Sequence, residues 1–234
     1  MQISAHDIAT MPRRRRAALV NSLSGCKSAN LVGTVNSHGR TNLAIMSSVV
    51  HLGSDPPLLA LVVRPGGDER HTLTNILANG HYSLNHVNAD IVEQAHQTAA
   101  RYPAEVSEFT ATGLTPQWVE GFPAPLVGEA NLSLGMRLRE QQRLDINGTH
   151  LVIGEVELIE MPGEAWREDG SLDLAAAGTV ALSGLDSYHR IESTKRMAYA
   201  KPDLPPRVLE THDGSSHEPH PQNVWRKTYE SSRR

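Results

Sequence analysis

The strongest constraint on the fold of this 234-residue chain is a long hairpin pattern between residues 132 and 159. Apolar residues alternate with polar or small ones from Leu132 to Leu138, and Asp145-Ile146-Asn147-Gly148 supplies a turn. Residues 151–159 then return as a second strand. Strict alternation buries one face of such a hairpin and leaves the other face to water or to a partner subunit.

Further strands are predicted before this hairpin. Residues 29–35 and 40–50 form two strands around the turn cluster Asn36-Ser37-His38-Gly39. The continuous apolar run Leu58–Val63 is typical of a strand buried on both faces, and another short strand is expected at 82–87. Most of the chain is therefore expected to form strands joined as hairpins.

Short helices are predicted at residues 12–23, 72–78 and 89–101, and residues 160–200 read as mixed and loop-rich. The regular strand-helix alternation of a doubly wound sheet is absent. We therefore expect a mainly β (α+β) fold, a small antiparallel barrel with peripheral helices. One domain is predicted over residues 1–200. From residue 201 prolines, charges and histidines replace apolar periodicity, which favours an extended tail or dimer arm over 201–234.

Composition narrows the function. The net charge is -4, and the one basic run, Arg13–Arg16, is typical of a solvated helix face, so we expect no nucleic-acid partner. A single cysteine, Cys26, excludes an internal disulfide. No apolar run approaches the roughly 18 residues of a membrane span, and the N-terminus lacks an apolar signal core. The expected location is cytoplasmic, without membrane attachment.

Several common kinds of site have no motif in the sequence. It contains no Rossmann glycine fingerprint, no P-loop, no C-x-x-C or H-E-x-x-H zinc motif and no G-x-S-x-G nucleophile elbow. Three histidines, His212, His217 and His220, lie close together in the tail, but a flexible tail does not preorganise a metal site. No metal site is predicted.

A candidate ligand site begins in the stretch Gly39–Ser48. On a strand, Asn42 can reach the edge of a ring, and the small Ala44 lets a flat ring approach the backbone. Ser47 and Ser48 offer hydroxyls to a phosphate or a ribityl chain.

The second part of the candidate site follows the Leu58–Val63 strand. Arg64 can bind phosphate through two parallel N–H donors, and His71 and Thr72 open a helix whose first amides favour an anion. Asp68 and Glu69 lie nearby and oppose an anion unless they point away. Each of these residues also fits a plainer interpretation as a turn flank, a helix cap or a surface charge.

A family resemblance adds to this interpretation. The order of T-N-x-A-x-x-S-S at 41–48, Asp55-Pro56-Pro57, Arg64-Pro65 and H-T-L-x-N-I at 71–76 resembles the flavin reductase-like, FMN-binding split-barrel family, which includes flavoredoxin. The likeness continues in residues 101–115 and 184–189, and covers roughly residues 25–190.

The resemblance implies a split β-barrel that binds FMN, and a homodimer with the flavin near the subunit interface. It places a set of residues against the flavin, namely Asn42, Leu43, Ala44, Ser47 and Ser48, and a set on its phosphate, namely Arg64, His71 and Thr72. It also places Tyr188 and His189 on a loop near the ring, although a tyrosine packed on the barrel rim fits equally well. Ile45 and Met46 stand where many relatives have a proline and an aromatic residue, so the substrate is not predicted.

The implied function is an NAD(P)H-dependent flavin reductase-like oxidoreductase. NADH or NADPH delivers hydride to the flavin, and a second flavin, a small molecule, oxygen or a partner protein accepts the electrons. Two alternatives stay open. One is a flavin-binding electron carrier without nicotinamide turnover, and the other is a split-barrel relative that binds another ligand, such as haem through histidine.

Overall fold

The computed structural model describes residues 1–66 and 71–213, and the chain divides into two units, Met1–Ile191 and Glu192–Arg234. Asp68, Glu69, His217 and His220 lie outside the described residues. The predicted boundary at residue 200 falls inside the second unit, which contains a two-stranded hairpin, β13 (Ser193–Met197) and β14 (Val208–Asp213).

The first unit contains five α-helices, one short 3-10 helix and twelve strands among its described residues. The helices are α1 (Ala5–Thr10), α2 (Arg13–Leu23), α3 (His71–Asn79), α4 (Val92–Gln97), α5 (Glu108–Thr112) and η1 (Gly163–Ala165). The strands are β1 (Lys27–Ser28), β2 (Asn30–Val35), β3 (Thr41–Met46), β4 (Val49–Ser54), β5 (Pro57–Val63), β6 (His81–His86), β7 (Pro116–Gln117), β8 (Leu126–Val127), β9 (Ser133–Arg143), β10 (His150–Glu160), β11 (Val180–Ser183) and β12 (Ser187–Arg190).

Seven of these strands form one antiparallel sheet in the order β3-β2-β6-β9-β10-β5-β4. Its two edge strands, β3 and β4, are consecutive in the chain, and only Ser47 and Ser48 lie between them. The link is held to β5, because the Val62 amide donates to the Ser48 carbonyl oxygen at 2.9 Å. The sheet therefore curls until its two edges are joined through two residues, and the prediction of a mainly β fold is confirmed.

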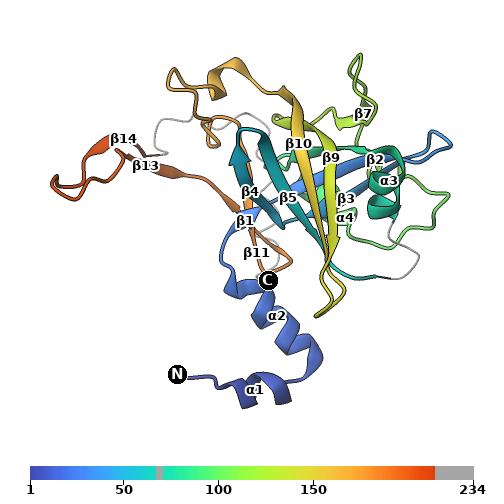
Figure 1. The fold of residues 1–234 in the computed structure, drawn as a ribbon, viewed down its shortest axis with the longest axis horizontal. Helices are drawn as coiled ribbons and strands as arrows, with labels where there is room; N and C mark the ends of the chain where they lie inside the picture. Colours follow the sequence, from blue (N-terminus) through green and yellow to red (C-terminus); the bar gives the residue numbers. More distant parts are fainter. Residues whose placement is uncertain (67–70, 214–234) are drawn as a thin grey trace, which may run out of the picture. The chain divides into compact units, whose positions relative to one another are not determined.

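The predicted long hairpin is present as β9 and β10, which cross the centre of the sheet in Figure 1. Its alternation places Met136 and Val152 inside the barrel, where neither side chain is exposed. The helix predicted at 72–78 is present as α3, which ends just before a glycine. Gly80 has φ of +71°, a conformation that side chains disfavour, and its amide donates to the Ile76 carbonyl at 2.9 Å.

Three predicted elements differ from the structure. The single strand predicted at 40–50 is wrong, because the chain leaves β3 after Met46 to reach the opposite edge of the sheet. The helix predicted at 89–101 is shorter, since α4 ends at Gln97 and the next hydroxyl, that of Thr98, bonds to strand β3. The segment 160–200, predicted as loop-rich, contains β11, β12 and β13.

Two hydrophobic clusters lie on opposite faces of the first strands. One fills the barrel with Val32, Leu61, Ile76, Tyr82 and their neighbours. The other packs Leu31 and Leu43 against α4, α5 and β11, where Phe109 is almost wholly buried. Residues that alternate along β2 and β3 thus serve both clusters.

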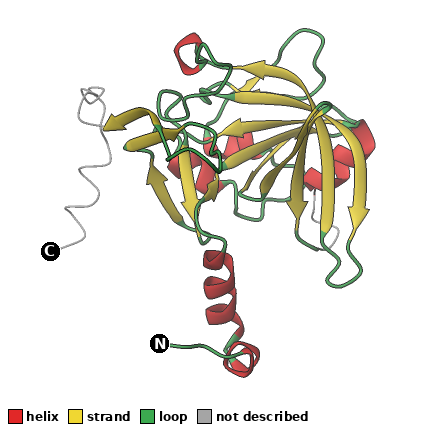
Figure 2. Cartoon of the chain, turned by 60° about the vertical axis from the view of Figure 1, so that its left-hand side comes forward, coloured by secondary structure: helices red, strands yellow, loops and turns green. Residues whose placement is uncertain are grey.

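The first two helices bury no residue, and Figures 1 and 2 show α1 and α2 projecting from the sheet. Within residues 1–66 and 71–213, no helix is long and apolar enough to cross a membrane.

Candidate functional site

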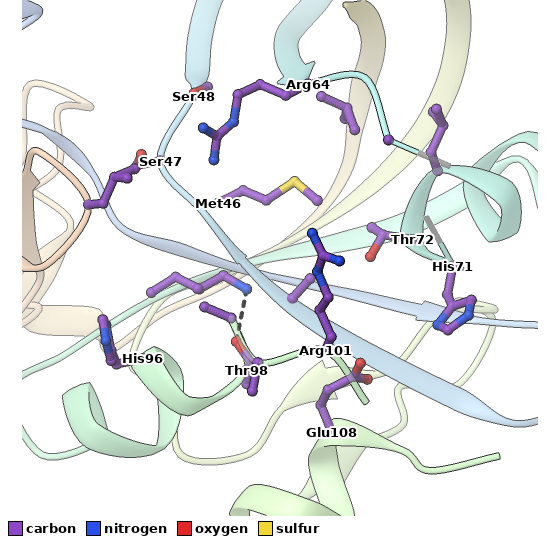
Figure 3. Close-up of a pocket in the computed structure, with 18 of the residues that line it drawn as sticks. Met46, Ser47, Ser48, Arg64, His71, Thr72, His96, Thr98, Arg101 and Glu108 are labelled. Atoms are coloured by element: carbon purple, nitrogen blue, oxygen red, sulfur yellow. Dashed lines mark hydrogen bonds between the residues drawn. The ribbon is translucent and has the colours of Figure 1, made fainter. Parts of the chain in front are cut away.

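A pocket of about 600 Å³ opens beside β3. Its walls come from β3, the Ser47-Ser48 link, the end of β5, the start of α3, the segment after α4, and β12. Figure 3 shows Ser47 and Ser48 on one side of this space, His71 and Thr72 on another, and His96 and Thr98 below. Segments distant in sequence therefore meet at one cavity.

The structure brings most of the predicted site residues together. Those that line the pocket are Asn42, Ala44, Ser47, Ser48, Arg64, His71, Thr72 and Tyr188. Two predicted residues are not among the lining residues, and strand alternation explains both. Leu43 points to the opposite face of β3 and is wholly buried there. His189 follows Tyr188 on strand β12, not on a loop, and its Nε2 lies 2.7 Å from the Ser183 hydroxyl.

A polar network joins β3 to the start of α3. The Asn42 side-chain amide donates to the Thr72 hydroxyl at 2.9 Å and to the Thr34 hydroxyl at 3.2 Å. The Asn75 amide donates to the same Thr34 oxygen at 3.1 Å. Because the Thr72 oxygen accepts from Asn42, its own O–H is left as a donor. Asn42 thus positions the helix start, while the hydroxyl of Thr72 serves the pocket.

This side of the pocket favours an anion. His71, Thr72 and Leu73, the first three residues of α3, line the cavity, and the unpaired amides of a helix N-terminus attract negative charge. Arg64 is exposed at the pocket, and its guanidinium has no partner among the residues that the structure describes. A planar guanidinium suits the oxygens of a phosphate.

The outer edge of β3 is closed by side chains that were not predicted for the site. The Leu43 amide donates to Oε2 of Glu108 at 2.9 Å, and the Ile45 amide donates to the Thr98 hydroxyl at 2.9 Å. That hydroxyl in turn donates to the Ala95 carbonyl at 2.7 Å. Both polar side chains are buried and line the pocket. They satisfy backbone groups that an edge strand otherwise leaves unpaired.

Sequence reasoning also missed several other lining residues, namely His96, Arg101, Tyr102, Leu182 and Leu185. Figure 3 shows the side chain of Arg101 extending from the segment after α4 toward Thr72. A signal for part of this set was present, because the family likeness includes residues 101–115. That likeness assigned no role in the site to any of these residues. Only the folded structure shows that the segment after α4 lies beside β3.

The far end of the pocket holds a tyrosine-histidine pair. The Tyr188 hydroxyl lies 3.1 Å from Nδ1 of His96, and the two rings meet edge to face with centroids 5.8 Å apart. Burial, and then the negative charge of Asp186, raise the pKa of Tyr188 to about 12. The phenol therefore stays protonated at neutral pH.

No group of three or more side chains that could hold a metal ion occurs among the described residues.

The fold agrees with the comparison to known families. The flavin reductase-like domain model matches residues 23–174, which is more than half of the chain. The chain therefore belongs to the flavin reductase-like family, and this membership supports a flavin-related oxidoreductase function.

Solved structures confirm the split-barrel fold. The chain is 50% identical to a protein from Shewanella frigidimarina NCIMB 400, described as a candidate flavin reductase with a split barrel domain. The match has a TM-score of 0.83 and covers 86% of this chain and 100% of that one. A flavoredoxin of Desulfovibrio vulgaris (Miyazaki F) shares the fold, with a TM-score of 0.65 at 21% identity over 87% of this chain and 98% of that one.

Curated relatives match over a shorter length. An uncharacterised protein of Aquifex aeolicus (strain VF5) is 29% identical over 132 residues, which are 56% of this chain and 66% of that protein. The chain thus spans slightly less than two thirds of the length of this relative.

Proposed function

We propose that this protein is an FMN-dependent NAD(P)H oxidoreductase of the flavin reductase type. One observation carries the proposal. A single cavity joins an anion-favouring end, formed by Arg64 and the start of α3, to a wall of small and apolar residues on β3. That arrangement matches a ligand with a phosphate at one end and a flat ring at the other.

The residues present fit FMN. The cavity volume of about 600 Å³ lies within the range of small-molecule sites. Arg64, His71 and Thr72 would hold the phosphate, and Ser47 and Ser48 would donate to it or to the ribityl chain. Neither serine hydroxyl has a hydrogen-bond partner within the described part of the chain. When bound, FMN supplies hydride and electron transfer.

The chain's own residues orient the ligand and keep the wall rigid. Ala44 leaves space beside the backbone, while Ile45 and Met46 cover neighbouring parts of the wall. Glu108 and Thr98 accept hydrogen bonds from the backbone amides at the outer edge of β3 and so hold this strand in place. No side chain has to exchange a proton for hydride to reach a bound flavin.

We propose a homodimer as the working form. Val50 and Leu52 on edge strand β4 are 52% and 47% exposed, and Leu151 and Ile153 lie partly exposed on β10 of the same sheet. Val62, between them on β5, lines the pocket. A second copy on this surface would cover apolar residues and wall the cavity. A cytoplasmic location fits the single free Cys26.

Anaerobic spectroscopy tests the function. We expect the purified protein to bind FMN, to show a flavin absorption band, and to lose this band when NADH or NADPH is added. Bleaching by dithionite alone would show a flavin-binding electron carrier. A colourless protein that ignores added FMN, or one with a haem Soret band, would overturn the proposal.

Light scattering tests the dimer. We expect twice the monomer mass for the wild type and a shift toward monomer in V50K, because a lysine would place a charge in the covered surface. A wild-type monomer that binds FMN tightly would contradict the dimer.

A further inference from the structure

The pocket has two chemically different ends. The anion-favouring end lies at Arg64 and α3, whereas the opposite end is formed by Leu182, Leu185, Tyr188 and His96. In Figure 3, His96 lies across the cavity from His71 and Thr72. A phosphate at the first end leaves the second end for another molecule or another part of the ligand.

Two elements 92 positions apart build the second end. His96 comes from α4, and Tyr188 comes from β12 and packs on the buried cluster beneath. The contact between the hydroxyl and Nδ1 is 3.1 Å, and the rings meet at 82°. Packing on the buried cluster and the contact with His96 therefore place the phenol at the wall of the pocket.

The local charges favour a neutral molecule at this end. The negative charge of Asp186, in the turn between β11 and β12, acts on the phenol, and Nδ1 of His96 from α4 lies 3.1 Å from its oxygen. The carboxylate of Asp186 disfavours an anion beside Tyr188. Leu182 and Leu185 add apolar surface. An uncharged, largely apolar compound fits this environment.

The phenol can act as a proton donor. Its O–H is intact at neutral pH, and the raised pKa means that the proton is given up only to an oxygen that gains negative charge. Which atom donates in the pair depends on the imidazole tautomer. When Nδ1 of His96 carries a hydrogen and donates to the phenol oxygen, the phenol O–H is left to point into the pocket. His96 can then return a proton to Tyr188 after each transfer.

We propose that Tyr188 and His96 form a proton-donating pair for a neutral conjugated carbonyl acceptor of the quinone class. The inference rests on the proposed function, which supplies reduced flavin as the reductant. The acceptor would take up two electrons and one hydrogen as hydride from reduced flavin, which is thereby oxidised, and its carbonyl oxygen would gain negative charge. The Tyr188 O–H bond breaks and its proton bonds to that oxygen. His96 reprotonates Tyr188 and takes a proton from water.

The test uses FMN-loaded protein reduced with dithionite, so nicotinamide is not needed. Reoxidation is followed with menadione, which needs protons, and with ferricyanide, which takes electrons only. We expect Y188F to slow menadione reduction by about 100-fold, the lower end of the range for general acids, and to leave ferricyanide unchanged. The solvent deuterium isotope effect on menadione reduction should differ in Y188F, because the proton must then come from water and not from the phenol.

His96 acts through Tyr188, so its variant needs a separate readout. H96Q keeps a hydrogen-bonding side chain beside the phenol but cannot relay a proton. We expect slower menadione reduction and an altered pH profile, with FMN affinity and the ferricyanide rate unchanged. A purely structural role predicts a wild-type pH profile in H96Q.

Three results separate the possible failures. If Y188F reduces menadione at the wild-type rate, or slows ferricyanide equally, the proton-donating pair is overturned while flavin binding stands. If Y188F instead weakens only NADH or NADPH binding, this end holds the nicotinamide and the acceptor assignment is overturned. Failure of the wild type to bind FMN in an absorbance titration removes the proposed function itself.

Discussion

The two edge strands of the seven-stranded sheet, β3 and β4, are consecutive in the chain. They differ in whether other parts of the chain cover their outer edge. The outward amides of Leu43 and Ile45 on β3 are bonded to the buried side chains of Glu108 and Thr98. On β4, Val50 and Leu52 are exposed, and no strand lies beyond it in the described part of the sheet. The closed edge forms a rigid pocket wall, whereas the open edge suits a second copy of the chain. One sheet thus has one edge closed by side chains and one edge open to a second copy.

Glu108→Ala should show the largest effect. Removing the carboxylate leaves the buried Leu43 amide without its acceptor, so we expect the free energy of unfolding to fall by about 3 kcal/mol. Urea unfolding measures the loss. Glu108→Gln keeps an oxygen acceptor and should lose clearly less. Equal losses in the two variants would show that the hydrogen bond does not close this edge.

Arg64→Ala should affect the ligand and not the fold, because Arg64 follows β5 beside the open edge and has no partner among the described residues. We expect FMN affinity to fall by about 1.5–3 kcal/mol, the range for hydrogen bonds to charged groups. Fluorescence titration with FMN measures it. Arg14→Ala, at an exposed position on α2 away from the pocket, is the control. Unchanged affinity in folded Arg64→Ala removes this residue from the phosphate site.

Thr98→Val tests the second bond that closes β3. Valine keeps the shape but cannot accept from the Ile45 amide, so we expect a loss of about 1 kcal/mol in unfolding free energy. Thr98→Ser keeps the hydroxyl and should retain most of the stability. A more stable Thr98→Val protein would contradict the role assigned to this hydroxyl.

Val50→Thr on β4 should give the smallest effect. The position is half exposed in the single chain and the change keeps the β-branched shape, so the free energy of unfolding of the dissociated chain should change by less than about 0.5 kcal/mol. Thermal unfolding at several protein concentrations measures it. A loss as large as that of Thr98→Val would remove the difference between the two edges.

Much of the fold followed from periodicity. Alternation at 132–159 and the apolar run at 58–63 predicted the central strands, because side-chain spacing reports directly which face is buried. The break at Ser47 and Ser48 was not predicted. Nothing in the local spacing distinguishes one long strand from two strands on opposite edges of a curled sheet.

The site was predictable only where it lies close together in sequence or in a known pattern. Asn42, Ser47 and Thr72 lie in motifs, and the structure places all three at the pocket. Glu108 and His96 reach it through tertiary packing. Their partners, the Leu43 amide and the Tyr188 hydroxyl, are 65 and 92 positions away, a separation that local patterns do not encode.

The ammonium group of Lys27 connects two backbone segments near the far end of the pocket. Lys27 Nζ donates to the Asn21 carbonyl at 3.0 Å and to the Gly184 carbonyl at 3.2 Å, and so joins α2 to the turn before β12. Both acceptors are main-chain atoms, which every amino acid provides. Mutation can therefore replace the Asn21 or Leu185 side chain at the cavity wall while this brace persists. Substitutions at the far end of the pocket can therefore change which ligand is bound there while the backbone keeps its position.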